Sequence, residues 1–288
     1  MSTESSPLLA ETVVQTRLAL RDRLNSSELR LPVLPKVAGA VLALAEDPDA
    51  DMADLSALIH RDQALASQVL RISNSAAYGV GSVIVSLQQA ITRLGMRLLA
   101  DIAIAISVQG ELFCVPGYQP DVKALWRHAL ASGTYSKEVA RLKRTNVEGQ
   151  FLCGLLHTVG KPIVLRILVD LLRERKQFLP RVAMFSLMDE FHCEIGQRVA
   201  TEWKLPQQIV FSAGYYLRRV EATTWPTETA ITYLAHHLAD WVLSTDNQVA
   251  APAPGDPVVT ELNIYPDELS CLLEKRESVL AAVAALDL

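Results

Sequence analysis

The sequence predicts an all-α protein, and three observations carry that prediction. Apolar residues recur at helical spacing along most of the chain, as Val37, Val41 and Leu44 do. Proline, glycine and short polar residues separate these stretches, which is where helices begin and end. Only Ser82–Ser86 and Val258–Val259 suggest extended backbone, and both are too short to build a sheet.

Length and composition restrict the class of function. The 288 residues are 50% hydrophobic and 20% charged, which is typical of a globular chain with a large core. The net charge of -5 argues against nucleic acid as a partner, because proteins that bind phosphate backbones usually carry a basic surface. No apolar run reaches the about 20 residues that a membrane span requires, so no membrane is expected. The four cysteines are widely separated and residues 1–11 lack a signal-peptide pattern, so we expect a protein of the reducing cytoplasm.

The N-terminal third predicts a lead-in helix followed by short helices. Residues 1–30 are amphipathic, and LPVLPK at Leu31–Lys36 has the proline spacing of a rigid turn. Asp51 and Asp62 are suited to cap the next helices, because a short side-chain oxygen can accept hydrogen bonds from the free N–H groups of a first turn. The two glycines of Asn74–Ser82 favour an ordered loop.

The middle of the chain predicts the most deeply buried helices. Met96–Val108 is apolar enough to be buried on nearly all sides. A long helix is expected from Val122 to about Arg144, followed by helices over Phe151–Val159 and Pro162–Arg175. Gly160 stands between these two, where a helix end favours a left-handed residue.

The C-terminal part predicts further helices and one linker. Helices are expected over about Ser186–Trp203, Gln207–Leu217 and Glu228–Ser244. Ala251–Pro257 is rich in proline and reads as a linker, and a final helix is expected near Pro266–Ala285.

Several stretches, taken in order and spacing, resemble the HDOD family. They are LPVLPK (31–36), IHRDQAL (59–65), RISNSAAYG (71–79), LWRH (125–128) and GLLHTVGK (154–161). The resemblance runs from about Leu31 to about Leu243. It implies a multi-helix fold of two lobes, an N-terminal helical lobe and a degenerate relative of the HD-type metal-dependent phosphohydrolases. The implied divisions are a lead-in helix (1–30), the HDOD-like domain (31–243, with lobes 31–113 and 121–243), and a linker with a C-terminal helix (244–288).

The resemblance also implies where a metal site would lie. In catalytic HD proteins a histidine, a His-Asp pair and a later Asp hold divalent metals that activate water to attack a phosphate. His128 matches the first histidine and His157 the histidine of the pair, but Thr158 stands in place of the Asp. Either His236 or Asp240 can be aligned with the final Asp. Because Thr158 removes a formal negative charge, we expect low metal affinity and assign neither metal ligands nor a cofactor.

The other candidate positions match catalytic HD proteins only in part. His192 matches a histidine of catalytic relatives, but the following histidine pair is replaced by Gly214–Leu217 (GYYL). Asp189 is placed three residues before His192, where it could orient that ring. Lys161 could bind an anion near the start of the next helix. The candidate vestigial pocket therefore comprises His128, His157, Thr158, Lys161, His192 and Asp240, with no catalytic residue assigned.

Each candidate also has a purely structural interpretation. His128 and His157 can be core histidines, the latter with a hydrogen bond to Thr158 that fixes its tautomer. Asn74, Ser75 and Tyr78 form a candidate interaction loop, whose polar side chains can equally cap and fix the corner between two helices.

The resemblance implies a non-catalytic bacterial regulatory or scaffolding module that binds a partner protein of a signalling pathway. Two alternatives stay open. One is a phosphohydrolase of a nucleotide or cyclic dinucleotide that uses His128, His157, His192 and Asp240 as an unusual ligand set. The other is a sensor of a nucleotide or another anion.

Overall fold

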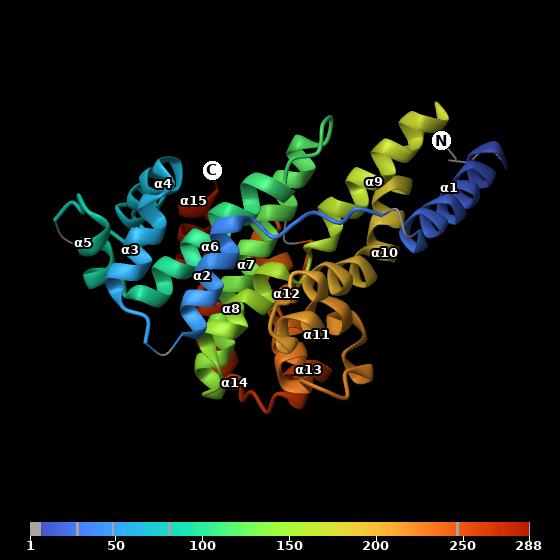
Figure 1. Cartoon of the computed structure of the whole chain (residues 1–288). Coiled ribbons are helices and arrows are strands. Elements are labelled where there is room, and N and C mark those ends of the chain that lie inside the picture. The colour runs from blue at the N-terminus through green and yellow to red at the C-terminus, as the bar shows by residue number, and fades with distance from the viewer. Residues whose placement is uncertain (1–6, 27–28, 48, 80–81, 246–247, 288) are drawn as a thin grey trace.

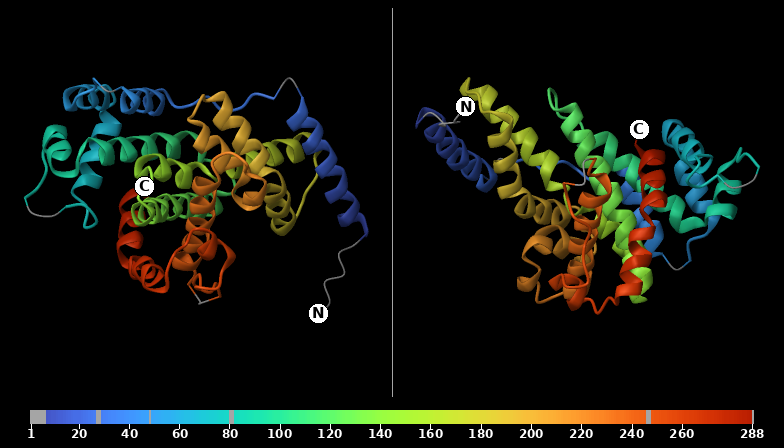
Figure 2. Two further views of the ribbon diagram at one scale, coloured as in Figure 1. Left: turned by 90° about the horizontal axis from the view of Figure 1, so that it is seen from below. Right: turned by 180° about the vertical axis from the view of Figure 1, so that it is seen from behind.

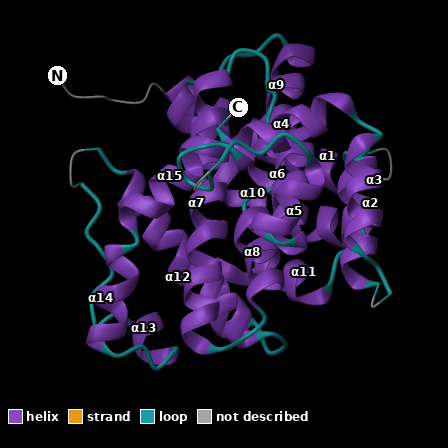
Figure 3. Cartoon of the chain, turned by 90° about the vertical axis from the view of Figure 1, so that its left-hand side faces the viewer, coloured by secondary structure: helices purple, strands orange, loops and turns teal. Residues whose placement is uncertain are grey.

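The computed structural model describes residues 7–26, 29–47, 49–79, 82–245 and 248–287. Within these residues the secondary structure is helical and no strand occurs, which confirms the all-α prediction (Figure 3). Parts of the expected lead-in segment, of the 74–82 loop and of the C-terminal linker lie outside the described residues.

The N-terminal lobe contains five helices that lie together at one end of the molecule (Figure 1). The side chain of Asp51 caps α3 by accepting from Ala53 N and Asp54 N, and Asp62 caps α4 by accepting from Leu65 N, as the sequence predicts. The long α6 packs on α2, α4 and α5 and contributes a nearly continuous run of buried side chains. These helices are α2 (Lys36–Glu46), α3 (Met52–His60), α4 (Gln63–Ser73), α5 (Leu87–Leu94) and α6 (Met96–Leu112).

The second lobe is built around α7, which packs against α8 and α12. Its helices are α7 (Gln119–Lys143), α8 (Val147–Leu156), α9 (Gly160–Arg175), α10 (Arg181–Glu202), α11 (Gln207–Tyr215), the 3-10 helix η1 (Tyr216–Glu221) and α12 (Pro226–Leu243). Gly154 allows α8 to approach α7 closely: a Cβ at this position would lie 2.4 Å from Ser136 Oγ and 2.6 Å from Ser132 O. The α7–α8 crossing therefore depends on a residue without a side chain.

The two ends of the chain pack against this second lobe. Helix α1 (Pro7–Asn25) contacts α9 and α10 at the end opposite α3–α5, where Arg17 pairs with Glu190 at 2.8 Å (Figure 1). The segment that follows crosses the molecule to α2, and Trp203 Nε1 donates to Pro32 O at 2.7 Å. The C-terminal helices α14 and α15 lie beside α7 (Figure 2).

Several boundaries differ from the sequence predictions for local reasons. Val258–Val259 is not extended but lies in the short helix α13 (Pro257–Glu261), which begins at a proline that suits a first turn. Gly160 does not adopt a left-handed conformation but begins α9. Ser82–Ser86 is irregular backbone rather than a strand. The single final helix is instead α14 (Pro266–Glu274) and α15 (Arg276–Leu286), which meet at Lys275.

One stretch, Gly149–Arg175, is long and apolar enough by composition to cross a membrane, but 78% of its most apolar window is buried inside the fold. It includes α8 and α9, and the residues between them carry His157 and Thr158. Its apolar character is accounted for by its place in the protein core.

Filling the space at Gly154 is expected to destabilise the protein. Gly154→Ala should lower the free energy of unfolding by about 1–3 kcal/mol, because the added methyl group would overlap the backbone of α7. The matched control is Gly110→Ala in α6, where an added Cβ meets nothing within 4 Å, and it should be neutral or stabilising by about 0.5–1 kcal/mol. Urea unfolding measures both variants, and equal effects would contradict the proposed close crossing.

Candidate functional site

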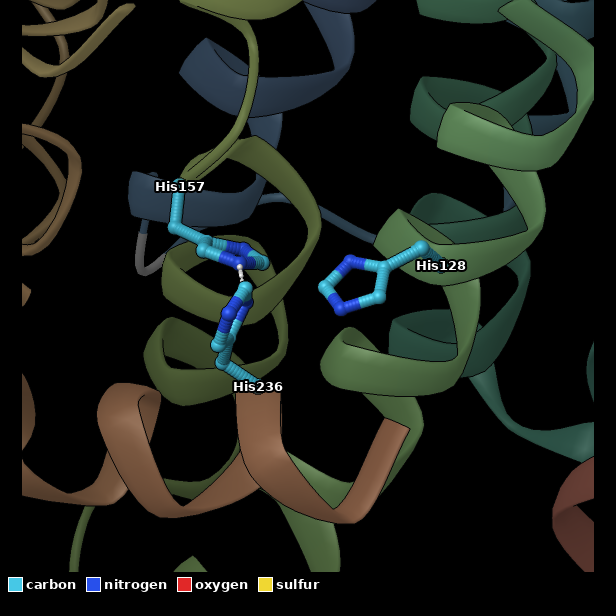
Figure 4. Close-up of side chains that lie close together, drawn as sticks. All are labelled: His128, His157 and His236. Carbon is cyan, nitrogen blue, oxygen red and sulfur yellow. Dashed lines mark hydrogen bonds between the residues drawn. The ribbon is translucent and has the colours of Figure 1, made fainter. Parts of the chain in front are cut away.

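Three helices of the second lobe bring three histidine rings together. His128 comes from α7, His157 follows the end of α8, and His236 comes from α12 (Figure 4). One ring nitrogen from each lies within 4.8 Å of the other two. The ring centroids are 4.7 Å apart for His128 and His236 and 5.3 Å apart for His157 and His236. We call these three residues the histidine cluster.

His157 is the most constrained member of the histidine cluster. Its side chain is fully buried, and its Nδ1 lies 2.7 Å from the carbonyl oxygen of Gly154. A carbonyl can only accept, so Nδ1 carries the proton and Nε2 presents a lone pair. This Nε2 lies 3.1 Å from Nδ1 of His236, which therefore donates to it. The close α7–α8 crossing and the orientation of His157 thus both involve Gly154.

Asp240 lies at the edge of the cluster, one turn beyond His236 on α12. Its Oδ1 is 3.0 Å from His128 Nε2, and its Oδ2 is 3.4 Å from His236 Nε2. Partial burial raises the pKa of Asp240, but the neighbouring His128, His236 and His237 outweigh this effect, so the net pKa lies below its ordinary value. Of the two residues that could be aligned with the family's final Asp, His236 lies inside the cluster and Asp240 against it.

Thr158 is buried and contributes no charge. Its side chain hydroxyl has no hydrogen-bond partner, and the partners of His157 are Gly154 and His236 instead. The suggestion that Thr158 fixes the His157 tautomer is therefore wrong, because a backbone carbonyl already holds that nitrogen. The position that carries a carboxylate in catalytic HD proteins holds an unpaired hydroxyl here.

His192 is separated from the cluster by Tyr216. Nε2 of His192 lies 2.8 Å from the Tyr216 hydroxyl, and the Tyr216 ring centroid is 4.6 Å from that of His157. Nδ1 of His192 lies 2.9 Å from the backbone oxygen of Asp189, so this residue orients the ring through its main chain and not through its carboxylate. Tyr216 belongs to the GYYL stretch, and it occupies the space between His192 and His157 with a buried aromatic ring.

Lys161 is engaged by an acidic residue. Its Nζ lies 3.0 Å from Oδ1 of Asp189, and its side chain is mostly buried. The positive charge that could attract an anion is therefore already balanced by an ion pair. The structure brings His128, His157 and Asp240 together, places Thr158 beside them without a polar contact, and sets Lys161 and His192 in a neighbouring group around Asp189.

The buried rings favour the neutral form of imidazole. Burial lowers the pKa of His157 and of His236 well below 6.5, and the proximity of His128 adds to the effect in both. Burial likewise lowers the pKa of His192 to about 4, and Lys161 adds to this. Burial raises the pKa of Tyr216 well above 10, so it is present as a phenol that donates to His192. Neutral imidazole is the form that binds metals.

The pair of hard metal ions that the HD resemblance implies does not fit these residues. Hard divalent ions need several oxygen donors, and their charge needs compensation by carboxylates. Asp240 is the carboxylate in contact with the histidine cluster, Thr158 is neutral, and Tyr216 fills the space beside His157. A two-metal hydrolytic centre would require both charge and room that these side chains do not provide.

A cavity between the two lobes lies apart from the histidine cluster. It has a volume of about 530 Å³ and is lined by residues of α2, α6, α8 and α11, among them Val41, Ile104 and Leu152. The candidate vestigial pocket does not coincide with this cavity, because none of its residues, His128, His157 and Lys161 included, lines the cavity. His128 and His236 lie instead on the packed helices α7 and α12, with His157 at the end of α8, whereas Lys161 and His192 lie on α9 and α10.

The candidate interaction loop is organised by Asn74. Its Nδ2 donates to Ile84 O at 2.8 Å, and its Oδ1 accepts from Ile84 N at 2.8 Å. Tyr78 packs partly against the core, and burial raises its pKa to about 12. Among the described residues that follow this loop, Val83 and Val85 are 74% and 71% exposed. Asn74 therefore has the capping role, and the sequence pattern did not single out the two valines.

The sequence is similar to a known protein family and to one relative of known sequence. The sequence model of the HDOD domain matches residues 31–217. The chain belongs to the HDOD family. An uncharacterized protein of Treponema pallidum (strain Nichols) is 28% identical to this HDOD protein over 206 residues, which are 68% of this chain and 39% of that protein. The chain thus spans well under half the length of that relative.

Solved structures share the fold of this HDOD protein. An HDOD domain protein of unknown function from Geobacter sulfurreducens has a TM-score of 0.68 and 25% identity, and the match covers 95% of this chain and 98% of that chain. A candidate metal-dependent phosphohydrolase from Shewanella amazonensis SB2B has a TM-score of 0.72 and 17% identity, with 95% and 99% covered. A candidate signal transduction protein from Marinobacter aquaeolei VT8 has a TM-score of 0.69 and 19% identity, with 95% and 67% covered.

Acid is expected to destabilise this HDOD protein, in part through His192. Between pH 6.5 and about 4 the unfolded chain binds a proton on this ring and the folded protein does not. The contribution of the neutral ring is therefore complete above pH 6.5 and is lost as the pH falls, by on the order of 3 kcal/mol. Urea unfolding above pH 6.5 and near pH 4 measures the difference.

The matched variants separate His192 from surface histidines. His192→Gln should reduce the pH dependence of unfolding, whereas His60→Gln, at the exposed end of α3, should leave it unchanged. A full pH dependence in His192→Gln would contradict the assignment.

Proposed function

We propose that this HDOD protein is a non-catalytic module of bacterial signal transduction that acts in the cytoplasm by binding a partner protein. The observation that carries this proposal is the burial of His157 and Thr158, which match the His-Asp pair, and of Tyr216 beside them. The exposed fraction is 0% for His157, 1% for Thr158 and 0% for Tyr216, whereas Asp240 at the edge of the cluster is part-exposed. A phosphoester substrate needs direct access to the metal-bound water of an HD centre, and the burial of these three side chains disfavours such access.

The chemistry of the residues supports the same proposal. Hydrolysis of a phosphoester by HD proteins depends on carboxylates that hold the metals and orient the attacking water. Thr158 cannot replace such a carboxylate, and the Tyr216 ring packs against that of His157 in an edge arrangement, with the centroids 4.6 Å apart. A module that has lost this chemistry but keeps its fold is best explained by a function of its surface.

The sensor alternative has less support. It required a free cation at Lys161, and Asp189 already neutralises that charge. The likeness to a candidate signal transduction protein is a likeness of fold. The proposal for this chain therefore depends on its own buried site rather than on that relative.

The exposed valines of the interaction loop are the part of the surface that we assign to the partner. Val83 and Val85 project from backbone that Asn74 and Arg93 hold in place, through hydrogen bonds to Ile84 and Ser82. Two exposed apolar side chains on a fixed loop are suited to packing against another protein, since apolar contact area supplies most of the favourable free energy of association.

Absence of hydrolysis tests the catalytic alternative. The purified protein should not hydrolyse bis(4-nitrophenyl) phosphate, nucleotides or cyclic dinucleotides with Mg²⁺, Mn²⁺ or Zn²⁺ added, because Thr158 is neutral where catalytic HD proteins have a carboxylate and Tyr216 packs beside His157. Product release measured by absorbance and chromatography would check this. Turnover that is lost in His157→Ala and kept in His237→Ala would overturn the non-catalytic proposal.

Site-specific crosslinking tests the partner surface. A photoreactive phenylalanine analogue at Val83 should give a discrete crosslinked band in cells, because the loop would lie against the partner. Val220, which is 86% exposed on η1, provides the matched control and should not give that band. The same bands from both positions, or none from Val83, would contradict an interface at this loop.

A further inference from the structure

The histidine cluster presents ring nitrogens to one another with too few protons and partners to satisfy all of them. We propose that His128, His157 and His236 bind a single borderline divalent cation such as Zn²⁺, with the carboxylate of Asp240 supplying negative charge beside it. The site differs from the HD two-metal centre in its donors and in holding one ion. It goes beyond the proposed partner binding and does not depend on it.

The first observation is a buried ring nitrogen beside a carboxylate. Nε2 of His128 is buried, and Oδ1 of Asp240 lies 3.0 Å from it. Buried polar atoms in folded proteins nearly always have a partner, and Asp240 is the one that the structure shows for this nitrogen. A cation bound between this nitrogen and the other two rings would keep the carboxylate beside it as compensating charge.

The second observation is the orientation of His157. Its Nδ1 donates to the Gly154 carbonyl, which leaves the lone pair of Nε2 directed into the cluster. Histidines that bind metals almost always donate their other ring N–H to a carbonyl or a carboxylate in this way. Without a metal, His236 donates from Nδ1 to His157. To bind the ion through Nδ1, its proton would move to Nε2, which faces Asp240 Oδ2 at 3.4 Å and could donate to it.

The third observation is the spacing of the donor atoms. Bonds of about 2.0–2.1 Å at tetrahedral angles place the ligand atoms of a zinc ion about 3.3 Å apart. Nε2 of His157 lies 3.1 Å from Nδ1 of His236, and Nε2 of His128 lies 3.0 Å from Asp240 Oδ1. Small rotations of the rings would close the remaining separation, which is at most 4.8 Å between the nitrogens.

The donor set decides which class of metal fits. Imidazole nitrogen favours borderline ions such as Zn²⁺, Co²⁺ and Ni²⁺, whereas Mg²⁺ requires oxygen donors. The low metal affinity expected from the sequence rests on the missing carboxylate at Thr158, and the proposal departs from it because three imidazole nitrogens come together. Three imidazoles with Asp240 beside them resemble a closed structural site rather than a catalytic one, which keeps a position open for water.

Direct binding measurements test the site. Full-length protein without an affinity tag is stripped with a chelator and titrated with ZnCl₂, CoCl₂ and MgCl₂ by calorimetry. One equivalent of Zn²⁺ or Co²⁺ should bind per chain, and bound Co²⁺ should show the intense visible absorption of tetrahedral coordination. No saturable Zn²⁺ binding, or Mg²⁺ binding of equal affinity, would overturn the proposal.

Matched variants identify the ligands. His236→Ala should abolish one-equivalent binding, whereas His237→Ala, whose ring packs on Tyr233, should retain it. Asp240→Asn changes a part-exposed side chain that the fold tolerates more readily than a buried one, and it should weaken Zn²⁺ binding by about 10- to 100-fold. Circular dichroism confirms that each variant is folded. Unchanged affinity in Asp240→Asn, or equal loss in His237→Ala, would contradict the assignment.

Discussion

The close crossing of α7 and α8 at Gly154 is the constraint on which the rest of the site depends. Without a side chain at this position, the backbone of α8 lies directly against Ser132 and Ser136 of α7. The Gly154 carbonyl then accepts the hydrogen bond that orients His157. The same crossing brings His128 of α7 within reach of that ring. Helix packing and the chemistry of the site thus share one residue.

Burial explains why this site differs electrostatically from a hydrolytic centre. Removal from water lowers the pKa of His157 and His236, so the rings are neutral where a catalytic HD protein would surround its metals with carboxylates. Tyr216 reinforces the change, because its ring packs on His157 and its hydroxyl pairs with His192. The described site therefore combines three imidazole rings, one carboxylate and a phenol rather than a set of carboxylates.

The histidine cluster and the exposed valines Val83 and Val85 lie in different lobes. The histidine cluster lies within the second lobe, enclosed by α7, α8 and α12. Val83 and Val85 lie in the first lobe, on a loop that Asn74 fixes to α4. The proposed metal site and the proposed partner surface therefore share no residue.

The sequence by itself determined the helices, their caps and the family, because these depend on local periodicity, on single residues such as Asp51 and Asp62, and on ordered motifs. It also identified the loss of charge at Thr158. It could not decide whether His236 or Asp240 aligns with the final Asp of catalytic HD proteins, because the two residues are one turn apart on the same helical face. It did not reveal that Asp189 pairs with Lys161, or that Tyr216 separates His192 from the cluster. Only tertiary structure decided these contacts, because they join side chains that are distant in sequence and meet through the crossing of helices.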